Sequence, residues 1–127
     1  MNEAQARQIV NARSGGRCEL CRASEPLTFS HRKPKGLGGL WTPSNGIRAC
    51  GSGTTGCHGW IEAHPEWAAE AGWRVSGTRD PATVLAWVWP VLAWPGWVWF
   101  DEEGGYVYPD DQPPAPPHLP PQAVQPL

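Results

Sequence analysis

Two cysteine pairs are the feature that most constrains the fold of this chain. Cys18 and Cys21 form a C-x2-C pair, and Cys50 and Cys57 form a C-x6-C pair with three glycines between them. Short-spaced pairs on flexible turns bring four thiolates to tetrahedral corners, as zinc requires. Four thiolates also fill the coordination sphere, so we predict a structural Zn²⁺ site. Two disulfides or free thiols are the alternative reading of the same four residues.

Length and hydropathy predict a small protein without a membrane partner. The 127 residues suit one domain with a modest core, which would gain folding free energy from a bound metal. No basic start followed by an apolar run marks a signal peptide. The Trp-rich stretch 86–100 is interrupted by Pro90 and Pro95 and is too short to span a bilayer. We therefore expect a cytoplasmic protein, in which thiols stay reduced and favour metal over disulfides.

The net charge of −2 conceals two halves of opposite sign. Residues 1–50 carry eight Lys and Arg against three Glu, whereas residues 51–127 carry two Arg against nine acidic residues. A basic half can face a polyanion while an acidic half points away, which predicts a nucleic-acid-binding face. Chance clustering of solvated surface charges is the competing explanation.

Periodicity and turn signals predict an α+β fold. We expect a helix over residues 3–13 with Asn2 as N-cap and Gly15-Gly16 at its end. The remaining expected elements are strands 27–32 and 46–49, a helix 57–63 that His64-Pro65 interrupts and 66–71 resumes, and a hairpin pairing 97–100 with 106–108 in the Trp-rich segment. The domain is predicted to cover residues 1–108 with its core at about 17–72, followed by a disordered Pro-rich tail over 109–127.

Three residues that carry catalytic chemistry lie around and between the cysteine pairs. His31 ends a predicted strand in SHRKPKGLGG, Asn45 follows a loop, and His58 comes directly after Cys57 in CGSGTTGCHGWIEAHP. A histidine, an asparagine and a Cys-His at a helix start, framed by two cysteine pairs, resemble the HNH endonuclease family. The two quoted segments are most similar to small HNH proteins encoded by bacteriophages. The resemblance covers about residues 7–80.

The resemblance implies a ββα-metal core, also called the His-Me finger, around one catalytic divalent cation. It makes His31 the general base and His58 a metal ligand, while Asn45 holds the loop and orients His31. A neutral imidazole titrates near neutral pH, and an asparagine oxygen can accept a hydrogen bond from one ring nitrogen. The cation would stabilise charge on the scissile phosphate. Mg²⁺, Mn²⁺, Ni²⁺ and Zn²⁺ all remain candidates for it.

One position departs from the family pattern. Family members usually carry an Asp or His ligand just before the base, and here that residue is Ser30. Glu62 lies four residues after His58 and would share its helix face, so it is one candidate replacement. His64 is the other, provided that Pro65 unwinds the helix. The sequence does not rank the two.

The resemblance and the basic half together predict metal-dependent cleavage of DNA. The residues expected to bind DNA phosphates are Arg32, Lys33, Lys35 and Arg48. By analogy with the phage proteins, a role beside the terminase in the host cytoplasm follows. The alternative is a zinc-stapled DNA-binding or adaptor module that has lost hydrolysis through Ser30.

Overall fold

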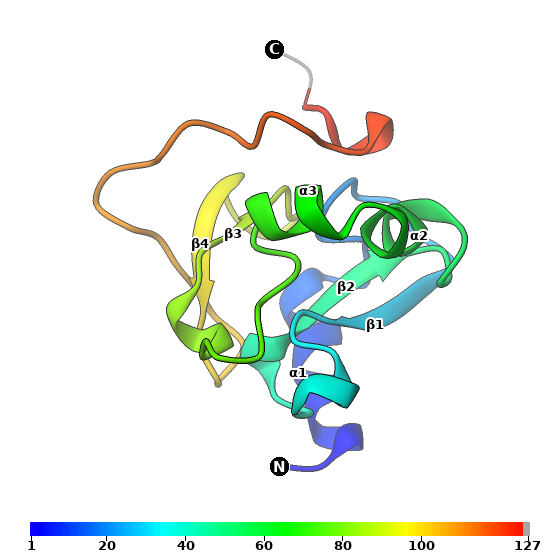
Figure 1. Ribbon diagram of the computed structural model, residues 1–127, viewed down its shortest axis with the longest axis vertical. Helices are drawn as coiled ribbons and strands as arrows, with labels where there is room; N and C mark the ends of the chain where they lie inside the picture. The colour runs from blue at the N-terminus through cyan, green and yellow to red at the C-terminus, as the bar shows by residue number, and fades with distance from the viewer. Residues whose placement is uncertain (126–127) are drawn as a thin grey trace.

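The computed structural model describes residues 1–125, which form two small antiparallel sheets with helices packed around them (Figure 1). This arrangement confirms the predicted α+β class. The helices are α1 (Glu3–Ser14), α2 (Gly56–Ala63) and α3 (Pro65–Glu70), and the strands are β1 (Leu27–His31), β2 (Gly46–Cys50), β3 (Ala86–Val88), β4 (Gly96–Phe100) and β5 (Tyr106–Val107). Short 3-10 turns are η1 (Lys35–Leu37), η2 (Pro43–Asn45), η3 (Pro81–Thr83) and η4 (Pro121–Ala123).

Local capping fixes both ends of α1. The Asn2 side chain accepts a hydrogen bond from the Gln5 N–H, and the Gln5 side chain accepts one from the Asn2 N–H, so the two form a capping box. Gly15 ends the helix in the left-handed region at φ 68°. The predicted helix and both of its caps are therefore confirmed.

Among residues 1–125, no helix combines the length and the apolar character needed to cross a membrane.

The hairpin of β1 and β2 lies between two helices. Its register pairs Leu27 with Cys50 and His31 with Gly46. Alternation along β1 turns Phe29 toward α1, where it packs in a small core with Ala6 and Val10. Thr28, on the opposite face, contacts His58 of α2. α2 is the next helix after β2 in the chain and packs against that strand, so β1, β2 and α2 form a ββα unit.

The second sheet has the order β3-β4-β5. Phe100 pairs with Tyr106, which confirms the predicted Trp-rich hairpin, and β3 adds a third strand through the pair Ala86 and Val98. Val98 and Phe100 reach the main core, whereas Trp94 in the β3–β4 loop is 82% exposed. Burial therefore accounts for only part of this tryptophan-rich segment.

The prediction of a disordered tail is wrong for residues 109–125. Ala123 is only 1% exposed in the main core, and Leu119 packs against the same cluster. The Gln112 side chain accepts a hydrogen bond from the Trp97 N–H and donates one to its carbonyl. The tail has few of the apolar residues from which packing is usually predicted. Its prolines have fixed φ angles, however, and this lowers the entropy cost of docking an extended segment. The last two residues of the predicted tail lie outside the described residues.

Candidate metal centre and catalytic site

The four cysteine sulfurs gather where the turn after α1, the end of β2 and the start of α2 meet. Their Sγ atoms all lie within 4.8 Å of one another, and those of Cys21 and Cys50 are 3.5 Å apart. Zn–S bonds of about 2.3 Å place tetrahedral sulfurs about 3.8 Å apart, so this donor set fits a zinc ion. The cysteines form no disulfide. Within residues 1–125 they are the one group of three or more potential ligands close enough to share an ion.

Two glycines shape the loop that presents the second cysteine pair. Gly51 and Gly56 have φ angles of 86° and 64°, in the region that side chains disfavour. A Cβ on Gly56 would also lie 2.6 Å from the Cys50 carbonyl oxygen, and one on Gly51 would clash with the Thr55 carbonyl. The glycines therefore let the chain between Cys50 and Cys57 close tightly enough for both sulfurs to face one point.

Hydrogen bonds and crowding decide how the thiols ionise. The Leu20 N–H donates to Cys18 Sγ at 3.4 Å, and the Cys57 N–H donates to Cys50 Sγ at 3.3 Å. Hydrogen bonds from the thiols of Cys18 and Cys57 lower the pKa of Cys21 to about 4. Hydrogen bonds with the thiols of Cys18 and Cys21 raise the pKa of Cys57, and burial adds to the effect. All four can be thiolates at this spacing only when a cation lies among them.

His31 ends β1 with its imidazole packed among aromatic rings. Its ring centroid lies 4.3 Å from that of Trp41 in an edge-on arrangement and 5.1 Å from that of Phe29. The Arg7 guanidinium carbon lies 4.8 Å from the Trp41 ring centroid, and Lys35 Nζ lies 5.5 Å from it. The imidazole is therefore packed between two aromatic rings, and two cations lie against the same rings.

Burial and neighbouring charge favour the neutral form of His31. Burial lowers the pKa of its imidazole, and the positive charges of Lys35 and Arg7 lower it further. His58 lies near enough that its charge also lowers this pKa. Nε2 of His31 is shut off from solvent and has no hydrogen-bond partner among the described residues. Any proton transfer by His31 in this conformation would therefore use Nδ1.

His58 is oriented from both sides of its ring. Nδ1 lies 2.7 Å from the Thr28 hydroxyl, and Nε2 lies 3.6 Å from Glu62 Oε1. Arg74 approaches the other Glu62 oxygen at 3.4 Å. Burial lowers the pKa of His58, while the Glu62 carboxylate acts in the opposite direction. His58 and Glu62 thus form a pair of potential ligands on one face of α2, as their spacing predicted.

Of the two replacements proposed for the ligand at Ser30, His64 is not brought to His58. Its ring stacks on Trp67 with centroids 4.8 Å apart and lies at the same distance from the Trp60 ring in a tilted arrangement. Its Nδ1 lies 3.0 Å from the Trp60 carbonyl oxygen. The helix break at Pro65 turns the ring into this stack, so the prediction that His64 binds the catalytic metal is wrong. Ser30 is buried on the same face of β1 as Thr28.

Asn45 holds a loop but does not touch the His31 imidazole. It is 1% exposed, and its Oδ1 accepts from the Lys33 N–H at 2.7 Å. Its Nδ2 donates to the carbonyls of Lys33 and Leu40. The predicted hydrogen bond to the imidazole is therefore wrong, because every polar atom of this amide is used by the backbone around it. Asn45 instead bonds to the backbone of Arg32 and Lys33, the two residues that follow His31.

The residues predicted to bind DNA divide into one buried and three more open positions. Arg32 is 0% exposed and donates to four carbonyls at 2.7–2.9 Å, so its predicted contact with phosphate is wrong. Lys35 is exposed, and Lys33 and Arg48 are half-buried. Burial lowers the pKa of Arg48, and the positive charge of Arg7 lowers it further. These two cations therefore lie near each other.

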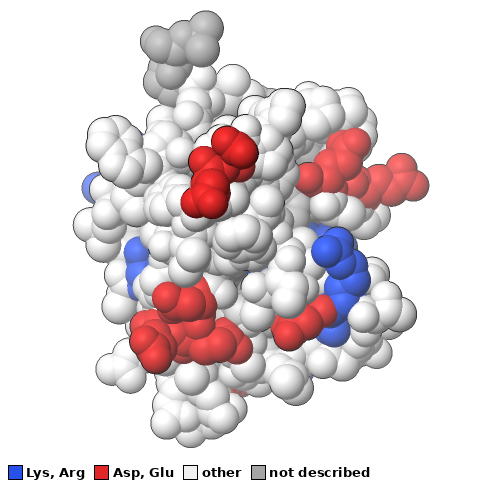
Figure 2. Space-filling view, turned by 90° about the vertical axis from the view of Figure 1, so that its left-hand side faces the viewer, with Lys and Arg blue, Asp and Glu red and all other residues white. Residues whose placement is uncertain are grey.

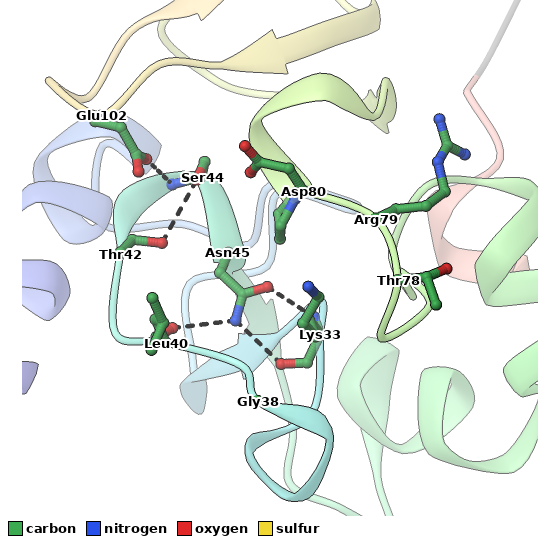
Figure 3. A pocket seen from close by; sticks show the side chains of 11 residues that line it. Lys33, Gly38, Leu40, Thr42, Ser44, Asn45, Thr78, Arg79, Asp80 and Glu102 are labelled. Carbon is green, nitrogen blue, oxygen red and sulfur yellow. Dashed lines mark hydrogen bonds between the residues drawn. The ribbon is translucent and has the colours of Figure 1, made fainter.

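A pocket of about 450 Å³ is lined in part by Asn45 and Ser44 (Figure 3). Lys33 and Arg79 line it together with Asp80 and Glu102, and neither His31 nor His58 reaches it. One oxygen of Glu102 accepts from the Ser44 N–H, and one oxygen of Asp80 accepts from the Ala82 N–H. These acids cap turns and give the pocket a mixed charge, so we do not place the chemistry there.

Sequence reasoning missed three side chains around the two histidines. Arg7 and Trp41 flank His31, and Thr28 orients His58. The excess of basic residues in the first half pointed to the region of Arg7 without singling it out. Thr28 lies two residues before Ser30 and so on the face toward α2, a signal that strand alternation contained. Nothing in the sequence marked Trp41, because its contact depends on how the loop folds back.

Comparison of this chain with protein-family models, curated proteins and solved structures finds no match. The functional proposal therefore rests on the residues and their arrangement.

Proposed function

We propose that this chain is a metal-dependent DNA endonuclease of the HNH type, stabilised by a structural zinc ion at its four cysteines. The observation that carries the proposal is the placement of His31 at the end of β1 and of His58 at the start of α2, where the charge of His58 is near enough to lower the pKa of His31. Both lie in one ββα unit, and the cysteine cluster ties the same hairpin to the same helix.

His31 would act as the general base. Its lowered pKa keeps the imidazole neutral, which is the form that accepts a proton from water. Trp41 and Phe29 hold the ring in place, and Nδ1 is the nitrogen left to receive the proton. The Asn45 amide stiffens the loop that follows, so that the ring keeps its orientation during attack on phosphorus.

His58 and Glu62 would hold the catalytic cation. An imidazole and a carboxylate four residues apart on one helix suit Mn²⁺, Ni²⁺ or Zn²⁺, and a site with few protein ligands leaves positions for water and phosphate. A bound cation supplies charge stabilisation at the scissile phosphate and at the departing oxygen. Thr28 fixes the rotation of the His58 ring by the bond at Nδ1, leaving Nε2 directed toward Glu62.

Cations around His31 would bind the DNA backbone. Arg7 from α1, Lys35 from η1 and Arg48 from β2 surround the end of the hairpin. Arg7 also forms an exposed ion pair with Glu3 at 2.9 Å, which is weak enough for a phosphate to replace. These three side chains would bind phosphates in place of Arg32, which is buried.

A supercoiled plasmid incubated with the protein and Mg²⁺, Mn²⁺ or Ni²⁺ tests the proposal. We expect nicked or linear product with wild type and at least a 100-fold slower reaction with His31→Ala, as loss of a general base predicts. His118→Ala, which removes a surface histidine outside the site, is the matched control and should cleave normally.

The adaptor module is the second candidate, favoured by one observation. Ser30 occupies the position where the resemblance expects a metal ligand, and it is buried. If wild type and His31→Ala bind DNA equally and leave the plasmid intact with every metal, the adaptor replaces the nuclease. Native mass spectrometry reports the zinc independently, because one ion per chain should be lost on chelation.

A further inference from the structure

Two of the four cysteine sulfurs receive hydrogen bonds from nearby backbone amides. Leu20 N–H donates to Cys18, and Cys57 N–H donates to Cys50. For Cys21, the Ala23 backbone is one of the groups that lower the pKa of the thiol. Four thiolates around one Zn²⁺ carry a net charge of about −2, and such donors disperse that charge and orient the ligands. A complete site would have a donor for each sulfur.

Cys57 differs from the other three because it lies in the first turn of α2. Two residues later, where Cys18 finds its donor, the Gly59 N–H is already committed to the Thr55 carbonyl at 2.8 Å. The structure supplies a donor from elsewhere, since Nε2 of Gln122 lies 3.5 Å from Cys57 Sγ. Gln122 lies in η4, within the segment that the sequence predicted to be a disordered tail.

Neighbouring contacts hold Gln122 against the cluster. Ala123 is 1% exposed, and Leu119 packs on the core that contains the cysteines. Before them, His118 stacks on Trp67 with ring centroids 4.3 Å apart, and its Nδ1 lies 3.1 Å from Glu70 Oε1. Prolines around these anchors restrict the backbone, so the amide is presented to the sulfur at little further entropy cost.

We infer that Gln122 is an outer-sphere residue of the metal centre, whose side-chain amide donates to the Cys57 thiolate and slows loss of the ion. The inference rests on the zinc site proposed above. In this arrangement the residue does not bind the metal. It stabilises the charge on one ligand, while the tail that carries it covers that ligand from solvent.

Zinc release from the full-length, zinc-loaded protein into an excess of a chromogenic chelator measures this role. Gln122→Leu keeps the approximate volume and removes the donor, and we expect release to be about 10-fold faster, at the lower end of known outer-sphere effects. Gln122→Lys restores a donor and should return the rate toward wild type. His118→Ala loosens the same tail at a different anchor and should change the rate less than Gln122→Leu.

Cobalt substitution separates the hydrogen bond from simple packing. The thiolate-to-Co²⁺ charge-transfer band should shift in Gln122→Leu and stay in place in His118→Ala, because only the first changes the charge on a ligand sulfur. Release from Gln122→Leu at the wild-type rate, with an unshifted band, would overturn the inference while leaving the zinc site standing. A wild-type protein that binds no zinc would instead overturn the metal site and this inference together. If Gln122→Leu fails to fold, Gln122→Glu, which keeps the shape and replaces the donor with an acceptor, gives the same comparison.

Discussion

Arg32 shows how burial decides what a charged residue does. Its guanidinium donates to the carbonyls of Ser44, Gly72, Pro81 and Val84, which belong to three separate loops. Burial lowers the pKa of Arg32 to about 9, so the group remains charged at neutral pH. The residue directly after the proposed base is thus a structural cation that joins the loops behind the site.

Replacement of Arg32 by methionine should destabilise the fold strongly. The change leaves four carbonyls without their donor, and we expect a loss of about 3 kcal/mol in the free energy of unfolding. Urea denaturation of the purified protein measures it. Lys33→Met, one position later, is the matched control. An Arg32→Met protein as stable as that control would contradict the structural role.

Cleavage should persist to lower pH than an ordinary histidine would allow. Burial and the charges of Lys35 and Arg7 disfavour protonated His31, so its pKa lies below the usual value of about 6.5. Activity should fall only as the pH drops through that lowered pKa. Lys35→Gln removes one of the charges, which raises the pKa and moves the acid limb to higher pH. The pH profile of plasmid nicking is the measurement, and an unmoved acid limb in Lys35→Gln would exclude this electrostatic coupling.

At the candidate site, the sequence revealed residues by chemical type and missed those that act through folding. The four cysteines and the pair His58 and Glu62 were readable because their spacing dictates their proximity. Asn45 was read correctly as a loop residue but wrongly as a partner of the imidazole, since hydrogen-bond partners depend on atomic positions. Gln122 carried no signal, because its role exists only after the tail has docked.

Among the elements, local rules predicted more than long-range rules did. α1, β1, β2, α2 and the β4–β5 hairpin follow from caps, alternation and turn residues within a few positions. The tail follows from none of these, because its order comes from contacts with residues far away in the sequence. The pairs Gln112 with Trp97 and His118 with Trp67 are examples.

Ending the chain at Tyr108 should therefore lower the thermal stability. The truncation exposes the core beneath Ala123 and removes both bonds between Gln112 and Trp97. A loss of roughly 2 kcal/mol corresponds to a Tm lower by about 5–10 °C for a domain of this size. Differential scanning calorimetry of the zinc-loaded protein measures it. A truncated protein with the wild-type Tm would show that the tail contributes nothing to stability.

Acidic and basic side chains are distributed unevenly over the surface of the molecule. Figure 2 shows the side occupied by β3 and β4 in Figure 1, where carboxylates gather in several patches and few cations are visible. Arg7, Lys35 and Arg48 instead lie around the end of the β1–β2 hairpin. The opposed halves of the sequence thus become a surface with a preferred side for a polyanion.

DNA binding should consequently depend on salt through those cations. Each phosphate contact adds about 0.9 to the slope of log affinity against log salt for duplex DNA. Lys35→Gln and Arg48→Gln should each weaken binding and reduce the slope by about that amount, whereas Arg79→Gln in the mixed-charge pocket should leave the slope unchanged. Fluorescence anisotropy at several salt concentrations is the measurement. Equal slopes for all three variants would place the DNA elsewhere.

The hydrogen bond between Gln122 and Cys57 can form only late in synthesis of the chain. The glutamine is added 65 residues after the cysteine, and at about 5–20 residues per second the ribosome needs roughly 3–13 seconds to make that stretch. All four thiols are translated before the amide that shields the last of them. Until the tail emerges and docks, an ion held by the four cysteines would therefore leave about 10-fold faster than it does from the finished chain.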